Sequence, residues 1–129
     1  TTEIYTLSLH DALPIFGLRI ERGPKPNILV EDGDILSVGG YQFEVRHTPG
    51  HTPGHVVFYC QDENLLFSGD VIFSGSIGRT DLPGGSYSEL MKSIWGKIMS
   101  LPDETRLCSG HGPQTSVGAE RIENPFLIT

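Results

Sequence analysis

Apolar and polar positions alternate over several stretches of the chain, and this period of two predicts β-strands. The alternation is clearest over Tyr41–Val45, and the Gly39-Gly40 pair joins that stretch to the apolar run Ile35–Val38. Two glycines between such runs predict a β-hairpin. Further apolar runs bounded by turn residues predict four more strands, at Asn27–Val30, Val56–Cys60, Leu65–Phe67 and Thr105–Cys108.

A second pattern, with apolar residues three or four positions apart, begins after Ser86 and predicts a helix that covers the sheet. Ser86 and Glu89 have the spacing of a capping box. The apolar positions of this helix are Tyr87, Leu90, Met91, Ile94, Trp95, Ile98 and Leu101. We therefore assign Met91 and Trp95 to the core rather than to a cofactor. A shorter helix is expected over Val117–Glu123.

The remaining stretches are predicted to be connections. Gln61–Asn64 is a polar turn, and the chain from Phe16 to Pro26 is irregular. The glycine-rich stretch 71–85 is expected to be a loop. It lacks the lysine of a phosphate-binding P-loop, so we do not interpret it as a nucleotide site.

Length and composition fit one globular domain. The chain has 129 residues, of which 37% are hydrophobic and 19% charged. It contains neither an apolar run of membrane-spanning length nor a pattern typical of a signal peptide, so we expect a cytoplasmic protein without a membrane partner. The net charge of −7 and the scattered basic residues argue against nucleic-acid binding. Cys60 and Cys108 lack C-x-x-C spacing and are interpreted as reduced core residues.

Three histidines, His47, His51 and His55, stand four residues apart in the stretch R-H-T-P-G-H-T-P-G-H. The prolines and glycines between them exclude a continuous helix, so this stretch is predicted to be a loop. Imidazole is the commonest metal ligand in proteins, and ordered loops often carry functional residues. The residues alone leave two interpretations open, a metal site and a turn with solvated histidines.

Two further strand ends each supply a side chain that can bind metal. Asp70 follows the strand Leu65–Phe67, and His111 follows the strand Thr105–Cys108. Strand-end loops that gather at one edge of a sheet are where a site is expected. Imidazoles with one carboxylate suit zinc or another first-row transition metal better than calcium. The alternatives are a turn or cap role for Asp70 and a solvated loop histidine for His111.

Four motifs in order resemble the metallo-β-lactamase fold, and within it the short bacterial glyoxalase II-like hydrolases, also called hydroxyacylglutathione hydrolases. They are T-P-G-H-T-P-G-H-V (Thr48–Val56), F-S-G-D (Phe67–Asp70), G-R-T-D-L-P-G-G (Gly78–Gly85) and S-G-H-G-P-Q-T-S-V-G-A-E-R-I-E-N-P-F-L (Ser109–Leu127). The resemblance implies an α/β (α+β) chain that forms the C-terminal half of an αββα sandwich. Its strands would be mostly antiparallel, with a covering helix.

The resemblance also implies residue roles around a site with two metal ions, expected to be zinc, with iron or manganese possible. His51 corresponds to a ligand of the first metal, Asp70 to the carboxylate that bridges both metals, and His111 to a ligand of the second. His55 corresponds to a position beside the site that is not a ligand. Arg79 corresponds to a basic residue that contacts an anionic substrate, and His47 corresponds to no functional position.

One family motif, H-x-H-x-D-H, which supplies further ligands, is absent from this sequence. Residues Thr1–Ile15 resemble the translation of a sequencing adapter. We therefore expect residues 1–15 to be an artefact, and residues 16–129 to be the C-terminal part of a single domain with an incomplete site and an exposed sheet edge.

The function implied for the parent protein is hydrolysis of a small-molecule thioester such as S-lactoylglutathione by a metal-bridging hydroxide. The alternatives are an iron-dependent persulfide dioxygenase, which shares a G-R-T-D string, and a fragment that is not catalytic by itself. A β-lactamase is disfavoured because Asp70 replaces the zinc-binding cysteine of common lactamases. The acyl group and the oligomeric state are not predicted.

Overall fold

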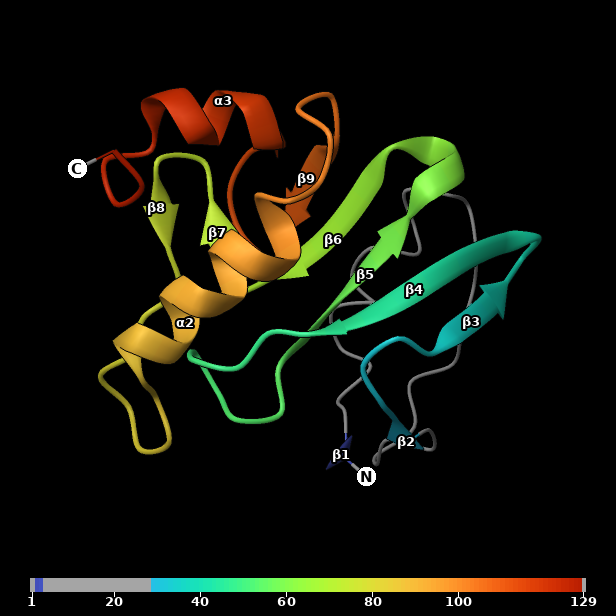
Figure 1. Ribbon diagram of the computed structural model, residues 1–129, viewed down its shortest axis with the longest axis horizontal. Helices are drawn as coiled ribbons and strands as arrows, with labels where there is room; N and C mark the ends of the chain where they lie inside the picture. Colours follow the sequence, from blue (N-terminus) through green and yellow to red (C-terminus); the bar gives the residue numbers. More distant parts are fainter. Residues whose placement is uncertain (1, 4–28, 129) are drawn as a thin grey trace.

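The computed structural model describes residues 2–3 and 29–128 (Figure 1). Its strands are β1 (Thr2–Glu3), β2 (Leu29–Val30), β3 (Ile35–Val38), β4 (Tyr41–His47), β5 (Val56–Cys60), β6 (Leu65–Gly69), β7 (Ile72–Phe73), β8 (Ser76–Ile77), β9 (Arg106–Ser109) and β10 (Thr115–Ser116). Its helices are the 3-10 turn η2 (Gln61–Glu63), α2 (Tyr87–Ser93), the π-helix η3 (Ile94–Ile98) and α3 (Val117–Glu123).

The main sheet has six strands in the order β10-β9-β6-β5-β4-β3. Neighbouring strands are antiparallel except for β6 and β9, which are parallel. Every residue of β5 and β6 is buried, which fits the apolar runs Val56–Cys60 and Leu65–Phe67. Since β4 and β9 both run in the direction of β6, the carboxyl ends of these three strands lie at the same edge of the sheet.

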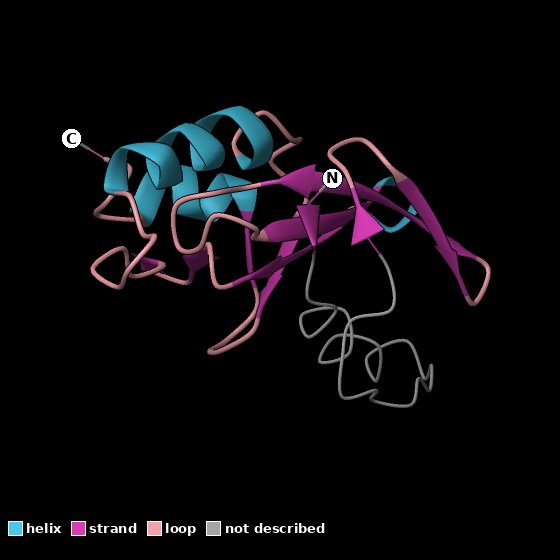
Figure 2. Ribbon diagram, turned by 90° about the horizontal axis from the view of Figure 1, so that it is seen from below, coloured by secondary structure: helices cyan, strands magenta, loops and turns pink. Residues whose placement is uncertain are grey.

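The alternation along the strands divides the core between two faces of this sheet. On one face α2, η3 and α3 pack over the sheet (Figure 2), and their cluster includes Leu66, Leu90, Ile94 and Leu107. The other face carries Phe43, Val45, Phe58 and Phe67, which are all at most 1% exposed. The fold is therefore a mixed α/β arrangement built on a mostly antiparallel sheet, as the sequence predicted.

Most predicted elements are confirmed. The bounds of β3, β5 and α3 are those expected, and β4 and β6 extend two residues further than predicted. The Ser86 hydroxyl accepts a hydrogen bond from the Glu89 N–H at 3.3 Å, which is half of the expected capping box. Of the strand predicted over Asn27–Val30, only β2 lies within the described residues, and of residues 1–15 only β1 does.

The prediction that Trp95 belongs to the core is wrong, because its exposed fraction is 44%; Tyr87, which shares the helical spacing, is 54% exposed. The helix changes from α to π geometry after Ser93. In this wider turn the side chains of Ile94 and Ile98 are fully buried, whereas that of Trp95 is partly exposed. Tyr87 stands in the first helical turn, in a stretch of exposed residues.

Two short elements were not predicted from the sequence. The stretch 71–85 contains the hairpin of β7 and β8, and β10 pairs with β9. The cysteines are confirmed as free, with Cys60 buried and Cys108 half-buried. Burial is the main cause that raises the pKa of both thiols. Within the described part of the chain, no helix has the length and apolar character needed to cross a bilayer.

Candidate metal centre

The histidine loop between β4 and β5 is fastened to α2. The Ser93 hydroxyl donates a hydrogen bond to the Pro49 carbonyl at 2.7 Å, and the Ser86 N–H donates one to the Gly50 carbonyl at 2.7 Å. Gly50 has a φ of +138°, and a Cβ at this position would lie 2.3 Å from the Leu90 Cα. The loop can approach the helix this closely only because residue 50 is glycine.

His51 points from this loop toward the end of β6. Its Nδ1 lies 2.8 Å from the Arg79 carbonyl, which can only accept, so Nδ1 carries the proton. The unprotonated Nε2 is then free to bind a metal, and it lies 3.9 Å from Asp70 Oδ2. A carbonyl behind a ligating histidine is the usual way of fixing its tautomer and ring orientation.

Asp70 lies directly after β6, between two imidazoles. His111, which follows β9, places its Nε2 3.6 Å from Asp70 Oδ1, the other carboxylate oxygen. The His111 side chain is 82% exposed, and its ring centroid lies 6.4 Å from that of Phe73. The parallel pairing of β6 and β9 brings these two strand ends together, as predicted from the sequence.

His55 supports Asp70 from behind. Its Nε2 accepts a hydrogen bond from the Asp70 N–H at 3.2 Å, and its Nδ1 lies 3.1 Å from the Thr48 hydroxyl. Burial is the main cause that lowers the pKa of His55 to about 4, with His51 and His47 adding to the shift and Asp70 opposing it. The neutral imidazole therefore uses Nε2 as an acceptor and orients the backbone of Asp70.

His47, to which the sequence assigned no role, also holds the loop. Its Nε2 lies 2.7 Å from the Pro53 carbonyl, and its backbone N–H donates to Asp32 Oδ1 at 2.8 Å. Asp32 in turn forms an ion pair of 2.7 Å with Lys97 of η3. The sequence held no signal for this role, because the strand was predicted to end at Val45 and the structure extends β4 to His47.

Arg79 contributes through its backbone in this structure. Its carbonyl orients His51, while its side chain, 60% exposed, pairs with Asp81 at 2.8 Å. This pairing lowers the pKa of Asp81 and raises that of Arg79. The predicted contact of the Arg79 side chain with substrate stays a prediction.

The donor chemistry fits part of a transition-metal site. A carboxylate with an imidazole nitrogen facing each oxygen matches the ligands that zinc and iron accept. Within residues 2–3 and 29–128, however, no three His, Cys, Asp or Glu side chains lie close enough together to hold an ion. The three residues are therefore brought together but do not by themselves form a closed site.

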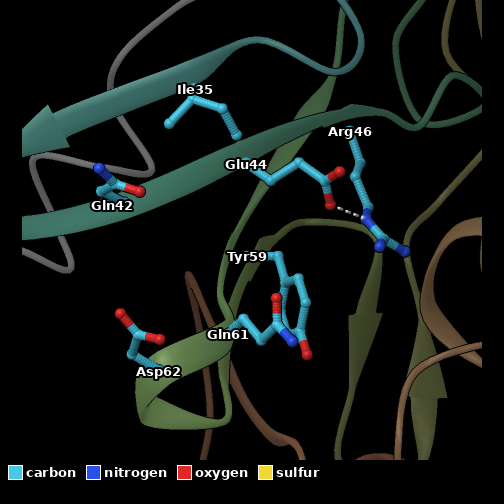
Figure 3. Close-up of a pocket in the computed structure, with 7 residues that line it drawn as sticks. All are labelled: Ile35, Gln42, Glu44, Arg46, Tyr59, Gln61 and Asp62. Carbon is cyan, nitrogen blue, oxygen red and sulfur yellow. Dashed lines mark hydrogen bonds and ion pairs between the residues drawn. The ribbon is translucent and has the colours of Figure 1, made fainter.

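A groove of about 240 Å³ lies elsewhere, beside β3, β4 and β5 (Figure 3). Arg46 crosses it, with its guanidinium 5.1 Å from the centre of the Tyr59 ring and its Nε donating to Glu44 at 2.7 Å. None of His51, Asp70 and His111 lines this groove. Its geometry therefore adds nothing to the candidate metal centre.

Residues 2–111 match the metallo-beta-lactamase superfamily. The chain is 43% identical over 120 residues to the "Probable metallo-hydrolase YqgX" of Bacillus subtilis, covering 93% of this chain and 56% of that protein. It is 46% identical over 97 residues to the "Hydroxyacylglutathione hydrolase GloC" of Haemophilus influenzae, covering 75% of this chain and 46% of that protein. The chain thus spans about half the length of these curated relatives.

Solved structures agree with this match. The B3 metallo-beta-lactamase BLEG-1 superposes with a TM-score of 0.78 at 46% identity, over 92% of this chain and 56% of that one. TTHA1623, crystallised in a di-iron-bound form, gives 0.72 at 44% identity, over 94% and 61% of the two chains. ETHE1 from Myxococcus xanthus gives 0.72 at 35% identity, over 77% and 45%.

Proposed function

Because the chain belongs to the metallo-beta-lactamase superfamily, we propose that it supplies His51, Asp70 and His111 as metal ligands of a thioester hydrolase of the glyoxalase II type. The observation that carries this proposal is the Asp70 carboxylate, which has an imidazole Nε2 3.9 Å from one oxygen and another 3.6 Å from the second. Asp70 would hold the metal ions together with His51 and His111, because carboxylate and imidazole donors suit zinc and iron.

The metal ions, zinc or iron, supply Lewis acidity and lower the pKa of coordinated water when they are bound. The residues of this chain orient that centre. The Arg79 carbonyl accepts from Nδ1 of His51, which selects the tautomer whose Nε2 can bind a metal, and neutral His55 holds the Asp70 backbone. A thioester releases a thiolate whose conjugate acid has a pKa of about 8.5, so no strong general acid is needed.

The substrate class rests on the similarity to the hydroxyacylglutathione hydrolase of Haemophilus influenzae. We propose a small-molecule thioester of the cytoplasm, with S-lactoylglutathione as the reference compound. In this proposal the Arg79 side chain leaves Asp81 to bind a substrate carboxylate, since arginine binds carboxylates through two parallel hydrogen bonds.

A second candidate is β-lactam hydrolysis, which is supported by the similarity to BLEG-1 at 46% identity. Persulfide oxidation with a single iron is a further alternative, for which the G-R-T-D string at Gly78–Asp81 is the sequence support. Thioester hydrolysis is preferred because of the similarity to the hydroxyacylglutathione hydrolase of Haemophilus influenzae, and because the family resemblance assigns Asp70 to the carboxylate position of the hydrolases rather than to the cysteine of common lactamases.

We also propose which part of the enzyme this chain forms and whether it is active alone. Residues 16–129 are proposed to be the C-terminal part of one domain, and the chain alone is proposed to bind zinc weakly and to leave S-lactoylglutathione intact. Three donors fall short of the four that a closed zinc site uses. Stoichiometric tight zinc binding together with turnover by the 129-residue chain would contradict this part.

A chimaera tests the activity directly. The N-terminal part of the Haemophilus influenzae hydrolase is joined ahead of Leu29, and the product is assayed with S-lactoylglutathione, a chromogenic cephalosporin and, with iron, glutathione persulfide. We expect thioester hydrolysis that is lost in Asp70→Asn and retained in Ser100→Ala, because the exposed Ser100 hydroxyl donates to the Gly96 carbonyl of η3, away from the candidate ligands. Turnover of the cephalosporin or the persulfide without thioester hydrolysis would overturn the proposal.

A further inference from the structure

Glu120 is a buried carboxylic acid to which the proposed function assigns no role. It lies in α3 and is only 3% exposed. No Lys, Arg or His side chain of the described residues forms an ion pair with it. A buried carboxyl group is costly unless its oxygens accept hydrogen bonds, so its partners indicate why it is there.

Both oxygens of Glu120 are used, and they join separate parts of the chain. Oε1 accepts from the Gly75 N–H at 2.8 Å and from Asn124 Nδ2 at 2.9 Å, and Oε2 accepts from the Thr115 hydroxyl at 2.5 Å. The fully buried Asn124 also donates to the Ser76 carbonyl at 3.0 Å. One carboxyl group thus fastens the tip of the β7–β8 hairpin to α3 and to the segment that follows His111.

The two ends of that hairpin lead directly to the candidate metal centre. Its first strand starts two residues after Asp70, and its second strand is followed by Gly78 and Arg79. Gly78 packs so closely on the Asp70 carbonyl that a Cβ would lie 2.0 Å from that oxygen. The next carbonyl, that of Arg79, accepts from His51. The hairpin therefore sets the spacing between Asp70 and the group that orients His51.

Two segments that the Glu120 carboxyl group binds also lie close to His111. Thr115, which this group holds, is four residues after His111, and Phe73 of the hairpin lies against the His111 ring. The His111 side chain is 82% exposed and its ring centroid lies 6.4 Å from that of Phe73, so the hairpin and the segment that carries Thr115 both lie close to it.

We propose that Glu120 is a positioning residue for the candidate metal centre, because its carboxyl group holds together the segments that carry or orient His51, Asp70 and His111. The inference rests on the proposed function, since it concerns the donors of the same centre. An apolar side chain of equal size could fill the same volume in the core. It could not accept the three hydrogen bonds that join α3, the hairpin and the His111 loop.

Two substitutions separate these roles in the full 129-residue chain. Glu120→Gln keeps the amide oxygen as an acceptor for Gly75 and Asn124, and the Thr115 hydroxyl can turn to accept from the new amide. Glu120→Met keeps the volume and removes all three acceptors. Leu101→Ala, a core change outside these hydrogen bonds, is the control for destabilisation alone, because Leu101 is buried in the cluster beneath the helices.

The first measurement needs no metal. Nitrogen-15 spectra of the imidazoles report whether Nδ1 of His51 carries its proton. We expect the wild-type signal in Glu120→Gln and Leu101→Ala, and a shift toward mixed tautomers in Glu120→Met. In the second measurement cobalt(II) is titrated and followed by visible absorption. Losing the residues that orient metal ligands weakens binding about 10- to 100-fold, which we expect for Glu120→Met and for neither of the others.

Wild-type imidazole spectra and wild-type cobalt affinity in folded Glu120→Met would overturn the proposal. If Glu120→Met does not fold, Thr115→Val decides. It removes only the donor to Oε2, so the ring-current shift of His111 next to Phe73 should change while His51 stays as in the wild type; an unchanged His111 would overturn the proposal. Imidazole signals that move in Glu120→Met while cobalt binding is too weak to compare would still support the positioning role, and the chimaera assay would then decide on the proposed function by itself.

Discussion

Replacing Gly50 by alanine tests how firmly the histidine loop is held by α2. The new Cβ would lie 2.3 Å from both the N and Cα atoms of Leu90, which belong to helical backbone and cannot turn aside. Overpacking of this kind costs about 1–3 kcal/mol, and a backbone conformation that L residues rarely adopt costs about 1–3 kcal/mol more. We therefore expect Gly50→Ala to lower the free energy of unfolding by about 2–6 kcal/mol.

Gly40→Ala is the matched control, because Gly40 also has a positive φ, of +86°, but a Cβ there meets nothing within 4 Å. It should lose only the conformational part, about 1–3 kcal/mol. Urea unfolding followed by circular dichroism gives both values, provided that the slope m is unchanged. The reasoning is refuted if Gly50→Ala is no less stable than Gly40→Ala, since the loop would then not be seated on the helix as described.

Three further predictions concern the same loop. The pKa of His55 is about 4 in the folded chain, below the ordinary 6.5, so the unfolded chain binds more protons between these values. Stability should therefore fall by up to about 3 kcal/mol as the pH drops from 6.5 to 4, and urea unfolding of His55→Gln should show a flatter pH profile. Ser93→Ala leaves the Pro49 carbonyl without its donor and should cost about 1–3 kcal/mol, against almost nothing for the exposed Ser100→Ala. Lys97→Met removes the partner that lowers the pKa of Asp32 and should cost less than about 1 kcal/mol, with a loss that shrinks at high salt; an effect independent of salt would contradict the ion pair.

The strand pattern was predictable because its cause is local. Alternation along Tyr41–Val45 reports which side chains meet the core, and the structure buries Phe43 and Val45 accordingly. Convergence of Asp70 and His111 was also predictable, since each lies within a few residues of the end of an apolar strand. The direction of β9 beside β6 then places them within reach of each other.

Other features depend on contacts that no local pattern records. Trp95 is 44% exposed although its spacing matches a buried face, and it lies in the segment that takes π geometry, which the spacing did not predict. The hairpin of β7 and β8 has strands of only two residues, too short to produce a period, and it is held by Glu120 and Asn124 from a distant helix. The Arg79 carbonyl that orients His51 is a backbone group, so the identity of residue 79 could not indicate it.

Because β4, β6 and β9 run in the same direction, His51, Asp70 and His111 all lie at one edge of the sheet and none of them lies at the opposite edge. The turns at that edge, Gly39-Gly40, Gln61–Asn64 and 102–104, are exposed. Surface turns of this kind tolerate insertions and new chain ends. The molecule therefore offers one edge at which a reporter domain can be spliced, or the chain circularly permuted, without disturbing the histidines and Asp70 on the other.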